Sequence, residues 1–289
     1  MDLLLVFIAF GVIALLGSAY AVYRWGWIAV ALFFAIIGIA FLIPKFSIEY
    51  LNFLSPFIIG ITGGYTFKKG KTLTFYMVTA AVALAVLLTG QYYYKAVVEK
   101  VDLIDEIKKM GERTFNELGT TDEVRAAAVR DFNGMIEGIG RQILPFLFFL
   151  NSLFYSALGF VLMPIFFRRF PESVPVKGLE YFRMRDYVIF ILILGWGSVL
   201  LIDRTRFPMV SLIGLNLALT SSVLYFIQAL GVIKYMLVRR GLPTYILPLA
   251  FLIMTVLGVG AMGFSLVMLI GLGTLDLWAD FRKLEKNTT

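Results

Sequence analysis

Cysteine and histidine are both absent from the 289 residues of this chain. Their absence excludes disulfides, zinc sites of the cysteine and histidine type, and every catalytic arrangement that depends on a thiol or an imidazole. Carboxylate, hydroxyl and lysine chemistry remains open, but we expect a protein that is not an enzyme and that carries no metal or cofactor. Charged residues are scarce too, at 16% of the chain, where a soluble domain has about a quarter.

Apolar residues take the place of the missing charge. They make up 60% of the chain, and the mean hydropathy is +0.87. The remaining polar surface is too small to cover a soluble globule, so membrane lipid must be the solvent for much of the protein. The length would suit two soluble domains, whereas a polytopic bundle of this size is normally one unit. We therefore expect a single integral membrane domain over residues 1–289.

Eight apolar runs approach or exceed the roughly 20 residues that a spanning helix needs. They cover residues 3–23, 25–43, 48–67, 72–94, 143–167, 187–202, 210–237 and 245–278. The last run is long enough for two short helices, and Gly258, Gly260 and Gly263 mark the expected break. The sequence therefore predicts an all-α polytopic transmembrane helical bundle with eight spans, or nine as the alternative.

The first apolar run has some features of a signal peptide. Ala19 and Ala21 offer a small-x-small cleavage pattern. The preceding segment, however, carries Asp2 and no basic residue, which is not typical of a signal peptide. We expect a retained first helix with an extracytoplasmic N-terminus.

Basic residues concentrate in one set of short loops. This set is Arg24, Lys68, Lys69, Lys71, Arg168, Arg169, Lys177, Arg183, Arg185, Lys234, Arg239 and Arg240. The opposite short loops contain only Lys45, Arg204 and Arg206. The positive-inside rule places the first set in the cytoplasm of a cell (inner) membrane protein. No continuous basic patch exists outside these loops, so we expect membrane lipid and no nucleic acid as partner.

The same rule bears on the number of spans. The basic C-terminal tail, which holds Arg282, Lys283 and Lys286, joins the cytoplasmic set if the chain crosses nine times. With eight crossings it faces the other side. The charge distribution therefore favours nine crossings or a broken last segment.

Residues 95–141 form the one sizeable polar insertion, between the fourth and fifth runs. They hold eight basic and ten acidic residues. Apolar residues at helical spacing from Val97 to Ile107 predict that the fourth span continues as an amphipathic helix. A turn is expected at 111–119, and Thr120 with Glu123 matches a capping box for a second helix with a stripe from Val124 to Ile139. This predicts an extracytoplasmic amphipathic helical hairpin, either a simple connector or an element that binds a partner or gates a substrate.

Several glycine motifs allow two interpretations. The stretch "GVGAMG" at 258–263 matches a dinucleotide-binding pattern, with acids about 20 residues further on. Its surroundings are apolar on both sides, so helix packing or a helix break is the better interpretation. The glycines at 60, 63, 64, 195 and 197 are interpreted as packing positions in the same way.

Polar side chains at membrane depth are the candidates for a ligand site. They are Asn216, Thr220 and Gln228 in the seventh run, with Asn52 and Asn151 in the third and fifth runs. In lipid such groups must face the bundle, where they bond to other helices or line a solute cavity. Both alternatives stay open. No acid or base lies deep enough for a proton relay, which argues against a proton-coupled pump.

The end of the last apolar run, "LGTLDLWADFRKLEK", carries a cluster of charges. Asp276 and Asp280 are spaced to share one helix face, with Lys283 within reach of both, and Trp278 with Arg282 forms a neighbouring pair. Trp278 suits an interfacial anchor. Paired carboxylates do acid–base or metal chemistry only in a pocket that shifts their pKa. A structural charge cluster is therefore the favoured interpretation.

Three stretches carry a resemblance to a known family. They are "LSPFIIGITGGYTFKKGK" at 54–71, "LIGLNLALTSSVLYFIQALGVIKYMLVRRGLP" at 212–243 and "LIGLGTLDLWADFRKL" at 269–284. The chain resembles the YybS-like family of bacterial multipass membrane proteins, domain of unknown function 2232. That family is distantly similar to the substrate-binding components of energy-coupling-factor transporters. The similarity implies a solute-binding subunit that works with a separate ATPase and coupling protein.

Two functional hypotheses follow. The first is a transport-related membrane protein that binds a small solute in a bundle cavity. The second is a non-transporting assembly or scaffold protein that binds protein partners through the 95–141 hairpin and the basic cytoplasmic loops.

Overall fold

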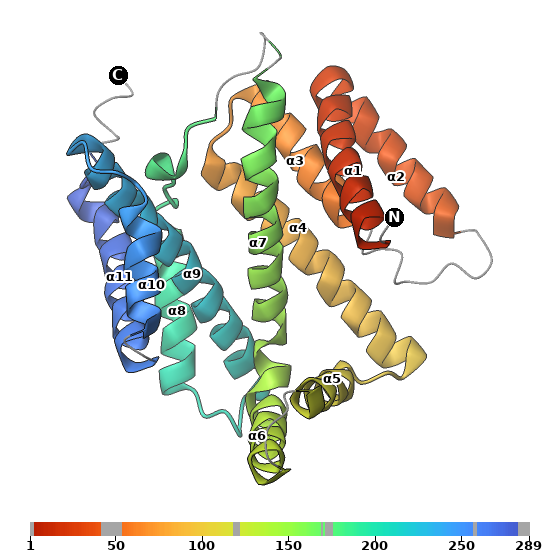
Figure 1. Ribbon diagram of the computed structural model, residues 1–289, viewed down its shortest axis with the longest axis vertical. Helices are drawn as coiled ribbons and strands as arrows, with labels where there is room; N and C mark the ends of the chain where they lie inside the picture. The colour runs from red at the N-terminus through yellow and green to blue at the C-terminus, as the bar shows by residue number, and fades with distance from the viewer. Residues whose placement is uncertain are drawn as a thin grey trace.

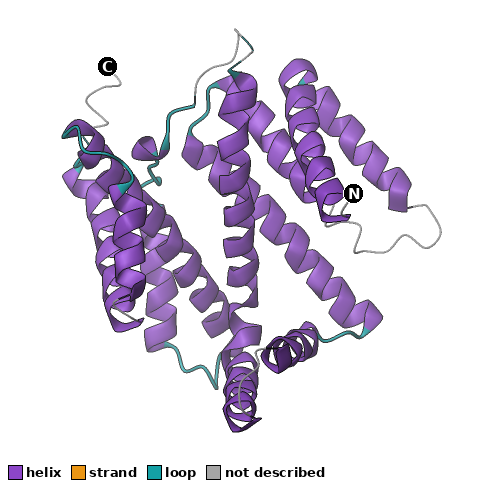
Figure 2. Cartoon of the chain, viewed as in Figure 1, coloured by secondary structure: helices purple, strands orange, loops and turns teal. Residues whose placement is uncertain are grey.

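The computed structural model describes residues 3–41, 54–117, 122–168, 170, 176–256 and 259–282. Its regular elements are helices, and no strand occurs in these ranges (Figure 2). The first helices are α1 (Leu3–Trp25), α2 (Trp27–Phe41), α3 (Ser55–Lys69) and α4 (Leu73–Tyr94). After the polar insertion come α7 (Arg141–Phe167), α8 (Val188–Leu201), α9 (Pro208–Arg239), α10 (Ile246–Val256) and α11 (Val259–Ala279).

The helices coincide with the apolar runs of the sequence. Three of the described helices, Leu73–Glu99, Glu123–Phe167 and Pro208–Arg239, are long and apolar enough to cross a membrane, and Val188–Leu201 and Gly263–Ala279 are shorter apolar helices. The protein is thus an all-helical membrane protein. The last run divides after Val256, and residues 257 and 258, with the predicted break at Gly258, lie outside the described ranges.

Helix α7 runs through the middle of the bundle, with α1–α3 on one side and α8–α11 on the other (Figure 1). Helix α4 packs against α7, and α9 packs against α7, α8 and α11. Helix α9 is therefore the element that joins the central helix to the C-terminal helices.

Glycines allow several of these helices to approach closely, as expected for membrane bundles. A Cβ added to Gly60 or Gly64 would lie 2.3 Å from the Leu15 carbonyl oxygen or 2.2 Å from that of Ala19, so no larger residue fits where α3 crosses α1. The same holds for Gly273 against the Tyr225 carbonyl oxygen, at 2.0 Å.

Of the other glycines that were predicted to pack, some contact a neighbouring helix and some do not. Gly63 packs against Met163 of α7, and Gly195 packs against Ala218 of α9. A Cβ at Gly197, Gly260 or Gly263 would meet no atom within 4 Å among the described residues. Gly260 and Gly263 also lie inside α11, so they neither pack nor break the helix.

The loops with most basic residues gather at one end of the bundle, where α11 also ends, and α5 and α6 lie at the opposite end (Figure 1). Contacts between side chains and backbone tie the first end together. The Nζ atom of Lys68 lies beside Gly26, and the Arg183 backbone N–H donates to Thr74 Oγ1 at 3.0 Å. The C-terminal segment bonds to this end as well, as described below.

The polar insertion folds as two helices, α5 (Leu103–Glu117) and α6 (Asp122–Met135), that pack against each other. A π-helical turn, η2 (Lys95–Glu99), extends α4 and a second one, η3 (Ile136–Gly140), leads into α7. The predicted continuation of α4 through Ile107 is wrong, because the chain reverses at Lys100, which has a positive φ of 56°.

The predicted turn at 111–119 also differs from the structure, which is helical through Glu117. Gly111 lies instead where α5 meets α6, since a Cβ there would lie 2.2 Å from the Phe132 ring. Thr120 of the predicted capping box lies outside the described residues. In the first apolar set of the insertion, Ile104 is buried. In the stripe of the second helix, Val124 remains 58% exposed.

Candidate functional site

Asn216 of α9 forms hydrogen bonds with backbone groups of α7 next to Pro145. Pro145 lies inside α7 and has no N–H, and its ring displaces the preceding turn. The Asn216 Oδ1 atom accepts from the Phe146 N–H at 2.8 Å, and its Nδ2 atom donates to the Gln142 carbonyl at 2.6 Å. These two groups are the partners that one regular helical hydrogen bond would join. The Asn216 amide therefore takes the place of that bond and fastens α9 to α7.

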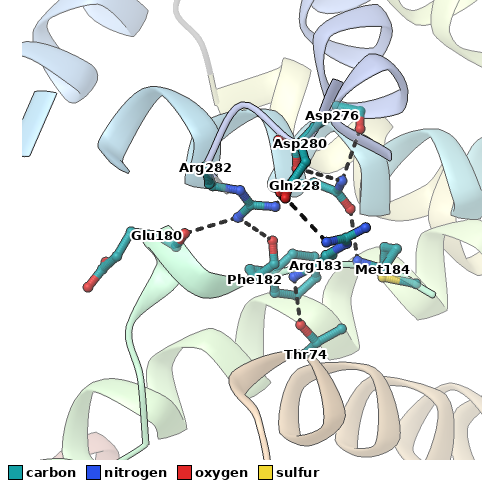
Figure 3. Close-up of polar contacts among 10 residues, drawn as sticks. Thr74, Glu180, Phe182, Arg183, Met184, Gln228, Asp276, Asp280 and Arg282 are labelled. Atoms are coloured by element: carbon teal, nitrogen blue, oxygen red, sulfur yellow. Dashed lines mark hydrogen bonds and ion pairs between the residues drawn. The ribbon is translucent and has the colours of Figure 1, made fainter. Parts of the chain in front are cut away.

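Gln228, three turns along α9, has a similar bridging role. Its Oε1 atom accepts from the Met184 backbone N–H at 2.8 Å, and its Nε2 atom donates to the Gly273 carbonyl and to Asp276 Oδ2, both at 3.1 Å. The side chain is completely buried. Gln228 thus connects α9, α11 and the segment 176–187 that precedes α8 (Figure 3).

Arg282 completes this buried polar cluster. Its Nη2 atom lies 2.5 Å from Asp276 Oδ2, and its Nη1 atom donates to the backbone carbonyls of Glu180 and Phe182 at 3.0 and 2.8 Å (Figure 3). The side chains of Arg282 and Asp276 are 0% and 1% exposed. The two carbonyls satisfy part of the buried guanidinium, whereas Asp276 Oδ1 and Arg282 Nε are buried without a hydrogen-bond partner among the described residues.

This geometry corrects the sequence-based pairing at the C-terminus. Helix α11 ends at Ala279, and Asp280 adopts a positive φ of 39°, so the chain turns back toward the bundle. Asp280 therefore leaves the helix face of Asp276 and lies 3.7 Å from Arg183 Nη1. Arg282 pairs with Asp276 in place of Trp278, which is 70% exposed. Lys283 lies outside the described residues.

A further ion pair holds the outer part of segment 176–187. Lys234 Nζ lies 2.7 Å from Glu180 Oε2, and both side chains remain partly exposed. Burial raises the pKa of the Glu180 carboxyl, but the hydrogen bond and positive charge of Lys234, with a backbone hydrogen bond, lower it to a greater total extent. The net pKa lies below the ordinary value, so the carboxylate stays charged at neutral pH.

A groove of about 790 Å³ lies beside this segment, between α4, α7 and α9. Its lining is apolar or glycine apart from Asn151 and Lys234. Gly178 and Leu179 of this segment are among its lining residues. Segment 176–187, which forms hydrogen bonds with Gln228, Arg282 and Thr74, therefore also lines the groove.

The structure places only some of the predicted ligand residues at the groove. Asn151 lines the groove, whereas Asn216, Thr220 and Gln228 are not among its lining residues. Asn216 and Gln228 use their amides between helices, and Thr220 is half-buried on α9. Asn52 lies outside the described ranges. Among the described residues no group of three or more acidic side chains is placed to hold a metal ion.

Lys234 of the groove and Thr74 were not among the sequence-based candidates. A lysine at the end of an apolar helix resembles a snorkelling residue, so nothing local distinguishes Lys234 from one. Pro145 gave a usable signal for the role of Asn216, because a proline inside an apolar helix leaves backbone groups that a polar side chain of another helix must satisfy.

Comparison with known proteins places the chain in a family. A sequence model described as "Predicted membrane protein (DUF2232)" matches residues 3–277. No curated protein and no solved structure matches the chain. The matched region runs from the start of α1 to near the end of α11 and includes Gln228 and Asp276 of the buried cluster. The chain therefore belongs to the DUF2232 family of predicted membrane proteins.

Proposed function

We propose that this protein binds a small, mostly apolar solute in the groove between α4, α7 and α9 and takes part in its transport across the membrane, without a chemical step. The groove itself carries the proposal. Its volume of about 790 Å³ lies in the range of small-molecule sites, which are mostly apolar with a few polar groups that orient the ligand. Here those groups are the Asn151 amide and the Lys234 ammonium.

The position of the two polar groups defines the expected ligand. Asn151 lies among leucine and phenylalanine side chains, where its amide offers both a donor and an acceptor. Lys234 lies beside segment 176–187 and is already paired with Glu180. A solute with an apolar body and one hydrogen-bonding group fits this distribution better than a highly charged one.

Thermal unfolding of the purified protein tests the proposal. One set of compounds has apolar bodies with a single amide, hydroxyl or carbonyl, and the other contains polar vitamins and amino acids. A ligand of the folded state at 100 times its dissociation constant stabilises it by about 2.7 kcal/mol. Stabilisation by members of the first set supports the groove. Stabilisation confined to the polar set would contradict it.

Matched substitutions locate the ligand. Asn151→Leu removes the groove amide, and we expect about tenfold weaker binding of a hit because one hydrogen bond is lost. Asn116→Leu makes the same change at an exposed position of α5 and leaves binding unchanged. Equal effects of the two substitutions would place the ligand elsewhere.

A second candidate function is the assembly of protein partners through the 95–141 hairpin and the basic loops. The observation that favours it is the exposure of apolar side chains on the hairpin, with Met110, Val124 and Met135 all more than half exposed. Co-purification of a defined partner that Met110→Ser with Met135→Ser abolishes, together with no stabilising solute, would replace the transport proposal by this one.

The proposed topology has nine crossings in the cell membrane, with the N-terminus extracytoplasmic. Helices α1–α4 and α7–α11 provide nine segments, and α10 with α11 forms the pair that replaces a single last span. The bonds from Arg282 to Phe182 support this count, because they join the C-terminal segment to the loop between α7 and α8. The basic loops would then face the cytoplasm together with the tail.

A further inference from the structure

A second pocket, distinct from the groove, lies at the basic end of the N-terminal helices. It has a volume of about 360 Å³ and is formed by the connection between α1 and α2, the last turns of α3 and the start of α4. Its walls include Trp27, Tyr65 and Phe75, and Lys68 and Lys69 stand at its edge. Lys68 lies beside Gly26, as described above, and neither lysine lines the proposed solute site.

The positive charge around this pocket has no counter-charge nearby in the sequence of the N-terminal helices. Residues 3–41 and 54–94 contain Arg24, Lys68, Lys69 and Lys71 and no acidic residue. In the part of the chain that the structure describes, no ion pair involves Lys68 or Lys69. The pocket is thus lined by two lysines, and none of its described lining residues is acidic.

Helix ends do not account for this charge. Helices α1 and α3 end here, and each C-terminus carries about half a negative charge. Helices α2 and α4 begin at the same end, and their N-termini carry about half a positive charge each. The helix contributions cancel, so they do not offset the positive charge of Lys68 and Lys69.

The aromatic residues show how a ligand would be oriented. The rings of Trp27 and Tyr65 lie 5.8 Å apart, and those of Tyr65 and Phe75 lie 5.9 Å apart, which forms a continuous row. Trp27 is 72% exposed and Ile28 is 68% exposed, so the apolar side of the pocket opens to the hydrocarbon region. Aromatic rings at such a boundary lie at the level of lipid headgroups.

We propose that this pocket binds an anionic phospholipid, with its phosphate against Lys68 and Lys69 and its acyl chains along the apolar walls beside Trp27. Basic pockets between transmembrane helices at the cytoplasmic side are suited to such headgroups. The pocket joins a phosphate-binding edge to a lipid-facing aromatic row, and a soluble phosphate would use only the first of these. The lipid then supplies the missing counter-charge between α1, α3 and α4.

Native mass spectrometry of the full-length protein tests this assignment at fixed ionic strength. Phosphatidylglycerol and phosphatidylcholine are added at equal concentration, and we expect tighter binding of the anionic lipid. Lys68→Gln with Lys69→Gln should weaken phosphatidylglycerol binding by about thirtyfold, because each basic residue near the headgroup contributes about fivefold. Lys68→Arg with Lys69→Arg keeps the charge and should keep the binding.

The matched control is Arg239→Gln with Arg240→Gln, which removes two adjacent charges at the same end of the bundle outside the pocket. Equal weakening by this control would show general surface attraction and overturn the pocket. Absence of any preference in the unmodified protein would overturn it as well. Binding of inorganic phosphate or glycerol 3-phosphate with the affinity of the lipid would assign the lysines to a soluble phosphate.

The tryptophan gives a second measurement that does not depend on the lysine variants. In Trp25→Phe, Trp196→Phe, Trp278→Phe protein, Trp27 is the remaining tryptophan, and excitation at the red edge of the absorption band selects it over the tyrosines. Brominated phosphatidylglycerol should quench its emission at lower lipid concentration than brominated phosphatidylcholine does. Equal quenching by the two lipids would contradict the proposal.

Discussion

At the scale of single residues, the buried amide of Gln228 shows how polar groups are used inside this bundle. One side chain satisfies the Met184 N–H, the Gly273 carbonyl and one oxygen of Asp276. Asp276 Oδ2 also accepts from Arg282, whereas Gln228 is the partner shown for the Met184 N–H. Unsatisfied buried donors and acceptors cost more free energy than a formed hydrogen bond contributes.

Gln228→Leu should therefore lower the free energy of unfolding by about 3 kcal/mol, because it removes hydrogen bonds to three elements and leaves the buried Met184 N–H unpaired. Reversible denaturation in detergent measures this loss. Gln142→Leu is the control, since the Gln142 side chain donates to the Gly138 carbonyl of its own turn and should cost less than about 1 kcal/mol. Equal losses in both variants would contradict the bridging role of Gln228.

Arg282 and Asp276 form a second test at this scale. Arg282→Met leaves the Asp276 carboxylate buried without its cation, and we expect a loss of about 3–5 kcal/mol in unfolding free energy. Adding Asp276→Leu to Arg282→Met should recover much of that loss, because no unpaired charge then remains. A double-mutant cycle on unfolding free energies measures the recovery. Strictly additive losses would show that the two side chains do not act as a pair.

At the scale of elements, the stability of α7 around Pro145 depends on the polar side chain of Asn216 on α9. Pro145 lies inside α7, and next to it the Asn216 amide accepts from the Phe146 N–H and donates to the Gln142 carbonyl. Asn216→Leu should cost about 2 kcal/mol in the native background. In a Pro145→Ala background the helix can form its own hydrogen bonds, so the same substitution should cost less. An unchanged cost, measured by denaturation, would contradict this account.

Glu180 of segment 176–187 forms an ion pair with Lys234, and the contribution of this pair to stability should depend on pH. The pKa of Glu180 lies below its ordinary value of 4.5, so the unfolded state binds more protons than the folded state in acid. The stabilisation by the Lys234 pair is complete above that ordinary value and is lost as the pH falls through the folded pKa. It amounts to less than about 1 kcal/mol because the pair is partly exposed.

Glu180→Gln removes this titration. We expect its melting temperature to lie slightly below that of the unmodified protein at pH 7 and the difference to shrink below about pH 4.5, the ordinary pKa of the group. Thermal unfolding at pH values from about 7 to about 3 measures the difference. A constant difference across this range would show that the pair does not contribute through ionisation.

At the scale of the whole molecule, the position of the charges sets the proposed orientation. The loops after α1, α3, α7 and α9 lie at one end together with the C-terminal segment, and the hairpin of α5 and α6 lies at the other (Figure 1). Because the native chain contains no cysteine, single introduced cysteines report sidedness without background.

Lys71→Cys and Asn287→Cys should react with a membrane-impermeant maleimide only after cells are opened, and Asn116→Cys should react in intact cells. Lys71 and Asn116 are exposed on the two opposite ends, and position 287 reports the tail. Reaction of Asn287→Cys in intact cells would reduce the count to eight crossings. Reaction of Asn116→Cys only from the cytoplasmic side would reverse the orientation.

The sequence by itself determined the solvent of this protein and the place of its helices. A run of about 20 apolar residues must form hydrogen bonds within its own backbone in lipid, so composition predicts a spanning helix without knowledge of its neighbours. The predicted runs and the observed helices agree for this reason, from α1 through α9. The hairpin agreed less well at its joints, because short polar helices end where tertiary contacts such as Gly111 with Phe132 dictate.

Only the tertiary structure decided what the polar residues do. Asn216 and Asn151 look alike in the sequence, yet one repairs α7 and the other faces the groove. Arg282 is a tail charge by sequence and becomes buried because the chain turns back after Ala279. Hydrophobicity belongs to each segment alone, whereas a hydrogen-bond partner exists only once two helices have packed, and that packing depends on contacts far apart in the chain.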